Sequence, residues 1–251
     1  MTKAQVPHLE NKGLVSNRRP SFLLKEYKMI LVKMRAWIKQ GRKGDEQHLR
    51  NMLYNYVLIL ANTGIRAGTE AMNLKWKHIG FEDVNGQRML TMNVKGKTQK
   101  GRTIYVPAAV ARFLNRIQNL DEELKRFSFD ELIEKQIDKY VLRDEMTTDE
   151  NAQTRYGKAF SRFLKQENVN LLKDKDTNEN RTLYSLRHFY ATKMIVSGEV
   201  TEIQLAKHMG TSTGMLHDHY EHLKLRDVAY KFVGKYTIEE GLKSNPIKKV
   251  S

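Results

Sequence analysis

The chain has 251 residues, and its 44 Lys and Arg against 29 Asp and Glu give a formal net charge of +15. This length allows a sizeable core, as one large domain or two small ones, and such a basic globular protein most often binds a polyanion, commonly nucleic acid. The lack of cysteine excludes disulfides, thiol catalysis and thiolate metal sites. No apolar run approaches the roughly eighteen residues of a transmembrane helix, and the N-terminus lacks a signal-peptide core, so we expect a cytoplasmic protein.

The first part of the chain is predicted to be helical after a basic arm. Residues 1–19 are polar and basic and are expected to form an arm or linker. Apolar residues spaced by three and four over 22–38 predict an amphipathic helix that ends at Gly41. A second helix over about 46–63 is apolar on nearly all sides, which predicts a place at the centre of the core. A short third helix is expected over 71–76.

The pattern then changes to that of a small antiparallel sheet. Residues 79–84 and 88–94 flank Asn85-Gly86, the strongest short signal for a β-hairpin. A third strand is expected over 103–106, after a basic loop over 95–102. The sequence therefore predicts three short strands in an otherwise helical chain.

Helices are predicted again over the rest of the chain. They are expected over 107–142, with a break near 119–121, and over 153–166. A further helix spans 183–195 and a last one 223–233. No internal repeat is present.

Four polar features occur in a fixed order and suit chemistry on a phosphodiester. Arg66 follows a helix-ending Thr-Gly, Lys97 lies in the hairpin loop, Arg187 lies on a late helix, and Tyr220 comes near the end. Two guanidiniums offer bidentate, permanently charged donors to the non-bridging oxygens. A lysine can protonate the leaving 5′-hydroxyl, and a tyrosine can store the bond energy in a covalent intermediate. This set requires no metal and no cofactor.

Around these residues the sequence resembles the tyrosine recombinases of phage-integrase type. The resemblance rests on five motifs in the order of that family: Thr63-Gly-Ile-Arg66-Ala-Gly-Thr-Glu70, Lys95-Gly-Lys97-Thr-Gln-Lys100-Gly-Arg102, Tyr184-Ser-Leu-Arg187-His-Phe-Tyr, Met209-Gly-Thr-Ser and His219-Tyr220. It implies a mostly α (α+β) catalytic domain over residues 20–236 with a small three-stranded antiparallel sheet. The arm over 1–19 would precede this domain and a polar tail over 237–251 would follow it.

The resemblance also implies roles for individual residues. Arg66 and Arg187 match the two clamp arginines, Lys97 the hairpin lysine and Tyr220 the nucleophile.

The basic loop offers more than one lysine. Lys95 and Lys100 are alternatives to Lys97, which we prefer because it occupies the Gly-Lys position of the family. With Arg102, these lysines predict a DNA-binding patch that contacts phosphates without reading sequence.

Two positions depart from the family in a way that affects proton transfer. Tyr184 stands where the family usually has histidine, and Thr211 stands where it has His or Trp. Both hydroxyls can still donate to a phosphate oxygen, and His208 is an alternative source of an imidazole. The general base is therefore left open. Glu70 also departs, because the acidic residue of the family often stands one position earlier.

Three histidines near the end of the chain invite a metal interpretation. His217, His219 and His222 are spaced by two and three, which does not place all three on one face of a helix. We expect no metal site.

The resemblance implies a site-specific recombinase, or integrase, that cleaves and rejoins double-stranded DNA through a 3′-phosphotyrosyl intermediate. It further implies integration or excision of a phage or mobile element, a homo-tetramer on DNA in the full-length protein, and association with the bacterial nucleoid during the reaction. The family usually has an N-terminal helical domain, and the nineteen residues of the arm are too few to form one. A catalytic fragment and a naturally short form are both compatible with this.

Two other functions stay open at the level of sequence. One is a DNA-relaxing enzyme of the type IB topoisomerase kind. The other is a non-catalytic DNA-binding regulator, because Tyr184 and Thr211 replace imidazoles.

Overall fold

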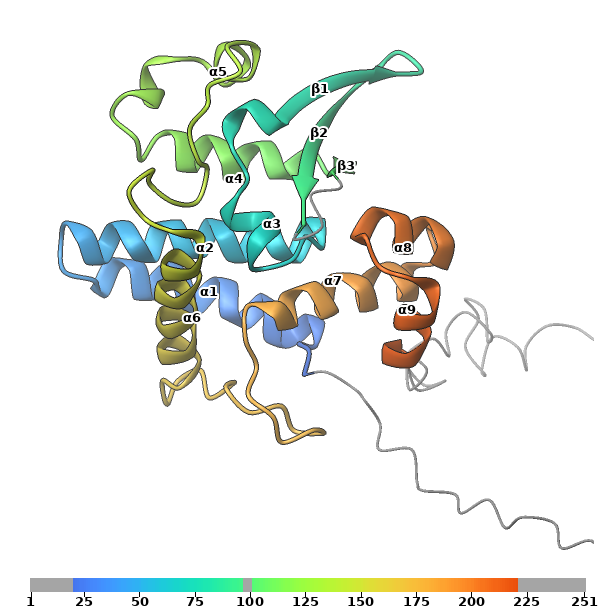
Figure 1. Cartoon of the computed structure of the whole chain (residues 1–251). Coiled ribbons are helices and arrows are strands. Elements are labelled where there is room, and N and C mark those ends of the chain that lie inside the picture. The colour runs from blue at the N-terminus through green and yellow to red at the C-terminus, as the bar shows by residue number, and fades with distance from the viewer. Residues whose placement is uncertain (1–19, 97–100, 221–251) are drawn as a thin grey trace, which may run out of the picture.

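The structure, a computed structural model, describes residues 20–96 and 101–220. The arm over 1–19, the helix expected over 223–233 and the tail lie outside these residues. Within them the fold is mostly α-helical with a small three-stranded antiparallel sheet, as predicted (Figure 1). The helices are α1 (Leu24–Gln40), α2 (Asp45–Thr63), α3 (Thr69–Met72), α4 (Ala109–Gln118), α5 (Phe129–Glu134), α6 (Asp149–Leu164), α7 (Tyr184–Ser197), α8 (Glu202–Met209) and α9 (Thr213–Tyr220).

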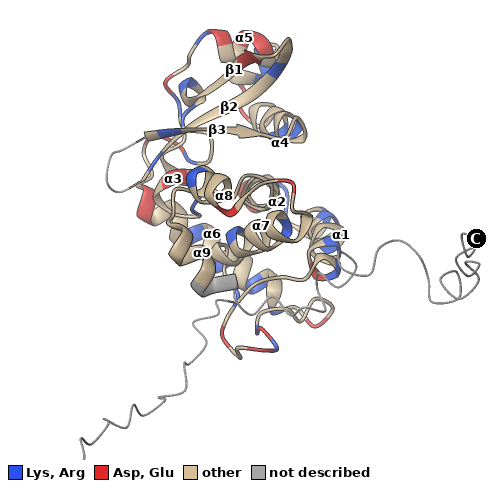
Figure 2. Ribbon diagram, turned by 90° about the vertical axis from the view of Figure 1, so that its right-hand side faces the viewer, with Lys and Arg blue, Asp and Glu red and all other residues tan. Residues whose placement is uncertain are grey.

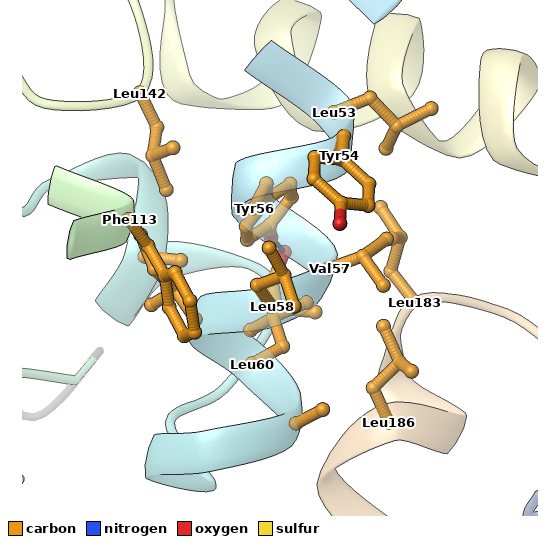
Figure 3. Packing of buried hydrophobic residues seen from close by; sticks show 14 of the residues in the cluster. Leu53, Tyr54, Tyr56, Val57, Leu58, Leu60, Phe113, Leu142, Leu183 and Leu186 are labelled. Atoms are coloured by element: carbon orange, nitrogen blue, oxygen red, sulfur yellow. Dashed lines mark hydrogen bonds between the residues drawn. The ribbon is translucent and has the colours of Figure 1, made fainter. Parts of the chain in front are cut away.

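Helix α2 is the centre of the core, as its all-round apolar sequence predicts. Figure 3 shows side chains of α2, such as Leu58 and Leu60, between Phe113 of α4 on one side and Leu186 of α7 on the other. Helix α1 lies alongside α2, and α6 crosses it at a steep angle (Figure 1). Because α2 is covered on several sides, its C-terminal end is held rigidly where the candidate site begins.

The sheet has the order β1-β2-β3, with strands Ile79–Val84, Gln87–Lys95 and Gly101–Val106. The turn residues Asn85 and Gly86 both have positive φ, +54° and +77°, as a tight hairpin turn requires. The alternate positions of β3 point toward the core, and Ile104 and Val106 are buried there. The same alternation places Arg102 on the inward side, which matters for the site below.

Of the helices predicted over 107–142, α4 ends at the expected break near 119–121, but the helical prediction is wrong for much of the part beyond it. The segment continues as a short 3₁₀ helix, Leu124–Arg126, then α5, and it is irregular after that. The buried amide of Gln118 donates to the carbonyls of Leu124 and Phe127, at 3.0 and 2.8 Å, so it favours a bent chain over a continuous helix. Backbone bonds from Trp76 and Lys77 to residues 137–139 hold the irregular part against the main core.

The first described residues are tied to the loop that precedes α7. The buried guanidinium of Arg181 forms ion pairs with Glu26 at 3.3 Å and Asp174 at 3.2 Å. It also donates to the carbonyl of Ser21 at 2.7 Å. A buried, multiply bonded arginine of this kind is costly to break, so it fixes the start of α7 relative to α1.

Helices α8 and α9 pack on a separate, smaller apolar cluster. It consists of Tyr190 and Ala191 of α7, Leu205, Ala206 and Met209 of α8, and Leu216 of α9. In Figure 1 these two helices lie at the edge of the molecule, beside the end of α7. Their position relative to the main core therefore depends on polar contacts as well as on apolar packing.

Basic residues lie on several elements of the described part of the chain. Figure 2 shows Lys and Arg on the sheet and on several helices, α1 and α4 among them. None of the described helices is long and apolar enough to cross a membrane. The basic character noted in the sequence is therefore not confined to one element.

Gly64→Ala is expected to destabilise the protein more than Gly86→Ala. Both glycines have positive φ, +66° and +77°, so a side chain costs about 1 kcal/mol at either position. A Cβ at Gly64 would also lie 2.3 Å from Cδ1 of Tyr190, whereas one at Gly86 meets nothing within 4 Å. Moving Tyr190 aside costs roughly 1–3 kcal/mol more. Urea unfolding measures both losses, and equal losses would contradict the close packing of Gly64 on α7.

Candidate active site

The site begins where α2 ends. Gly64 adopts the left-handed conformation that terminates many helices, and its N–H donates to the carbonyl of Leu60 at 3.1 Å. The buried Ile65 anchors the turn, and Arg66 follows with its side chain 37% exposed. The Thr-Gly frame therefore places a partly exposed guanidinium at the rigid end of the central helix.

A buried carboxylate, Glu70 of α3, holds this arginine. One oxygen of Glu70 accepts from the backbone N–H of Arg66 at 2.9 Å, and the other forms an ion pair with its guanidinium. Arg102 of β3 binds the same carboxylate in bidentate fashion, at 2.7 and 2.9 Å. Burial alone would raise the pKa of Glu70, but these donors outweigh it and lower the pKa to about 2. Glu70 is therefore a charged bridge between two arginines.

Arg187 occupies a buried position on α7 between the ends of α2 and α8. Its guanidinium donates to the carbonyl of Gly64 at 2.5 Å and to that of Met209 at 2.8 Å. Burial lowers the pKa of Arg187, and the neighbouring Tyr184 acts in the opposite direction. An arginine keeps its charge even so, because its ordinary pKa is far above neutrality.

Three arginines thus meet at the C-terminus of α8. The backbone carbonyls of His208, Met209 and Gly210, here called the carbonyl triad, each accept from a different side chain. Arg102 Nε donates to the first at 2.8 Å, Arg187 to the second, and Arg66 to the third. The last carbonyls of a helix lack partners within it and carry partial negative charge, so they attract cations. We call Arg66, Arg102 and Arg187 the arginine cluster.

The carbonyl triad leads directly into the helix that carries the predicted nucleophile. Gly210 has φ +65°, and Ser212 then caps α9 by accepting from the N–H of Met215 at 3.1 Å. Tyr220 is the last residue of α9, and its side chain lies outside the described ones. The arginine cluster and the backbone of the tyrosine helix are therefore linked through a short turn.

His208 lies in the last turn of α8, and its imidazole contacts groups of α2 and α7. Its Nε2 is 2.9 Å from the carbonyl of Thr63 and 3.1 Å from the hydroxyl of Tyr190, whose ring stacks on the imidazole. Burial lowers the pKa of His208. In the neutral form Nε2–H donates to the carbonyl, so this nitrogen ties α8 to the end of α2.

Tyr184 and Thr211, which stand at positions where the family has imidazoles, lie at the start of α7 and just after the end of α8. Tyr184 begins α7, is 43% exposed, and its ring centroid is 5.2 Å from that of His188. Thr211 follows the carbonyl triad, with its N–H donating to the carbonyl of Ala206 at 3.0 Å. Their assignment as phosphate donors stays a prediction.

The basic loop departs from β2 beside the arginine cluster. Lys97 and Lys100 lie outside the described residues, and Lys95 is exposed. A Cβ at Gly96 would lie 3.8 Å from Nη1 of Arg66, so the residue before Lys97 borders the site.

Arg102 has a different place from the one expected of a surface patch. Its side chain is only 18% exposed, and it turns inward to Glu70 and α8. The sequence places it with the loop lysines, and its link to Glu70 was not predicted. The signal was present, because Arg102, Ile104 and Val106 alternate along β3 and share its inward face.

The described residues include no group of three or more His, Asp or Glu that is arranged to hold a metal ion. Of the three C-terminal histidines, only His217 has a described side chain.

Comparison with known proteins gives likeness in structure only. No family model matches the sequence, and no curated protein matches it significantly. XerA recombinase is 19% identical with a TM-score of 0.57 over 88% of this chain and 66% of that one. XerH site-specific recombinase, bound to its difH substrate before cleavage, is 20% identical with a TM-score of 0.55 over 86% of this chain and 53% of that one. The Tn1549 transposon integrase in complex with circular intermediate DNA is 19% identical with a TM-score of 0.52, over 88% and 67%.

The described part of the chain therefore has the fold of the tyrosine recombinase catalytic domain. The chain spans about half to two thirds of the length of these proteins. The fold expectation from the sequence motifs is confirmed.

Glu70→Gln is expected to reduce the acid sensitivity of the protein. The pKa of Glu70 is about 2 in the folded state and about 4.3 in the unfolded chain. The ionised carboxylate therefore contributes stability above about pH 4.5, on the order of 3 kcal/mol, and this is lost as the pH falls through the folded pKa. The difference in unfolding free energy between wild type and variant should shrink from pH 5 toward pH 2.

Urea unfolding at several pH values measures this difference. Glu134→Gln, which alters an exposed carboxylate on α5, serves as the control and is expected to change stability little throughout. A Glu70 effect that does not vary with pH would contradict the ion pairing described above.

Proposed function

We propose that the protein is a site-specific DNA recombinase that cleaves and rejoins strands through a 3′-phosphotyrosyl intermediate at Tyr220. Residues 20–236 are its catalytic domain in this proposal. The observation that carries it is the convergence of Arg66 and Arg187 on the turn that begins the helix of Tyr220. A phosphodiester bound by both guanidiniums would lie next to that helix.

The charge of the site suits the proposed reaction. Three guanidiniums and one carboxylate leave two net positive charges around the carbonyl triad. Negative charge on the non-bridging oxygens increases as tyrosine attacks, and fixed donors in a partly buried site stabilise that increase. Each such donor lowers the barrier by roughly 3–4 kcal/mol. The preorganised guanidiniums are the main source of rate enhancement in this proposal.

The remaining roles follow the sequence prediction. Tyr220 gives its phenol proton to a general base, whose identity the sequence leaves open, and attacks phosphorus; the bond to the 5′-oxygen breaks, and Lys97 supplies the proton to that leaving oxygen. The position of Gly96 beside Arg66 supports this, because Lys97 is the next residue. Tyr184 and Thr211 offer hydroxyl donors to the phosphate in place of imidazoles. Rejoining reverses the step when a 5′-hydroxyl attacks the phosphotyrosine.

We propose double-stranded DNA as the substrate, by analogy with proteins of similar fold. XerH was solved with its difH substrate and the Tn1549 integrase with circular intermediate DNA. We propose integration or excision of a phage or mobile element, by a homo-tetramer on DNA acting at the bacterial nucleoid. The net charge of +15 agrees with a nucleic-acid partner.

Covalent trapping tests the nucleophile. Duplexes tiled across the DNA that flanks the gene, each with a nick or a bridging phosphorothiolate, form the substrate pool. The wild-type protein is expected to give a denaturant-stable protein–DNA adduct, and Tyr220→Phe none, because phenylalanine has no nucleophilic oxygen. Tyr105→Phe is the matched control, since it removes an exposed hydroxyl from β3 and should leave the adduct yield unchanged.

An adduct that persists in Tyr220→Phe would place the nucleophile elsewhere. A folded protein that binds the pool without any adduct, both as this chain and as the full gene product, would refute the cleavage reaction.

The adduct is expected to form equally well in an excess of EDTA. The arginine cluster supplies the positive charge that a divalent cation provides in metal-dependent phosphoryl transfer. Gel quantification of the adduct with EDTA and with added Mg²⁺ measures this. A yield that falls in EDTA and returns with Mg²⁺ would show a metal-dependent reaction.

A further inference from the structure

Glu70 poses an electrostatic problem for the proposed reaction. Its carboxylate is fully buried and touches the guanidinium of Arg66, the arginine with the more exposed side chain of the two that bind it. A carboxylate in contact with one guanidinium cancels most of its charge at a distance. If Glu70 had Arg66 as its only partner, Arg66 would offer little attraction to a phosphate.

We propose that Arg102 is a positioning residue that neutralises Glu70 and so keeps the charge of Arg66 available for the phosphate. This inference rests on the proposed function, because it deepens the role of the same site. Arg102 acts through Glu70 and Arg66 and does not itself touch the phosphate.

The side chain of Arg102 binds Glu70 more completely than that of Arg66 does, as a neutralising role requires. Arg102 gives both terminal nitrogens to Glu70, at 2.7 and 2.9 Å, whereas Arg66 pairs through Nη1 alone. Arg102 is 18% exposed and Arg66 37%. The inner arginine is thus the principal counter-charge, and the outer one has the more exposed side chain.

A third bond prevents Arg102 from turning outward. Its Nε donates to the carbonyl of His208 at 2.8 Å, so each of its three guanidinium nitrogens makes a hydrogen bond. Gly210 makes room for it, since a Cβ there would lie 2.6 Å from Nη1 of Arg102. Arg102 therefore also fixes the turn before α9 relative to β3, the strand that follows the lysine loop.

The three hydrogen bonds of Arg102 require an arginine, but the neutralisation of Glu70 requires only a positive charge. A lysine has a single nitrogen and cannot make a bidentate pair with Glu70 while also binding His208. It would still place a positive charge beside the carboxylate. The proposal therefore separates two effects, which Arg102→Lys and Arg102→Gln distinguish.

Binding of inorganic phosphate to the free protein tests the charge balance without any DNA. The probe is followed by the Nε–H resonances of Arg66 and Arg187 in ¹⁵N-labelled protein. Arg102→Gln removes one of the two net positive charges and is expected to weaken phosphate binding by about tenfold. Arg102→Lys should weaken it by less than about threefold, because the charge remains.

The decisive variant removes both charges. Glu70→Gln with Arg102→Gln leaves Arg66 and Arg187 without the carboxylate, which restores two net positive charges. Phosphate affinity is expected to recover to within about threefold of wild type. A merely structural role for Arg102 predicts the opposite, because each lost bond would add to the damage.

Arg88→Gln is the matched control. Arg88 is an exposed arginine on β2 that pairs with Asp130 and lies on the Phe81 ring, outside the arginine cluster. Its loss should leave phosphate binding at these resonances unchanged. Thermal unfolding of every variant identifies any that fails to fold, and Arg102→Lys keeps the comparison informative if Arg102→Gln does.

Two results would overturn the inference. One is phosphate affinity that is equal in wild type and Arg102→Gln; if Arg102→Gln does not fold, the corresponding result is a loss of about tenfold or more in Arg102→Lys, which keeps the charge. The other is a double variant that binds no better than Arg102→Gln. Neither depends on strand cleavage, so the absence of a covalent adduct with both this chain and the full gene product would refute the proposed function and leave this test intact.

Discussion

The buried carboxylate of Glu70, paired with Arg66 and Arg102, is the interaction on which the site depends. A charge in that position is stable only with close counter-charges, and here they come from the end of α2 and from the inner face of β3. One ion network therefore joins β3 to α3 and to the end of α2. It also sets how much positive charge the site offers to an anion.

The carbonyl triad extends this network to the C-terminal helices. Helices α8 and α9 pack on a small apolar cluster of their own. Three arginines from separate segments bind the last carbonyls of α8, and His208 adds a bond to the end of α2. Arg66 and Arg187, which are proposed to bind the phosphate, thus also hold the turn that precedes the helix of Tyr220. Substrate binding and the placement of that helix therefore depend on the same two side chains.

The structure gives a physical setting for Tyr184 and Thr211, two positions where the sequence departs from the tyrosine recombinase pattern. The imidazole of His208 supports α8 through Thr63 and Tyr190. Hydroxyls at Tyr184 and Thr211 can donate to an anion. In the proposed reaction, transition-state charge is then stabilised mainly by arginines, whose charge is constant over the physiological range.

Sequence alone was sufficient for the helical class, the hairpin and its Asn85-Gly86 turn, and the central place of α2, because these depend on local periodicity and turn chemistry. It also identified Arg66 and Arg187 as a pair. Tertiary structure decided that no long helix follows the break after α4, since the amide of Gln118 binds carbonyls that only folding brings near. It likewise decided that Arg102 turns inward to Glu70, because an ion pair between residues 32 positions apart depends on how β3 packs against α3. Local sequence patterns indicate on which face of an element a side chain lies, but not which distant residue it contacts.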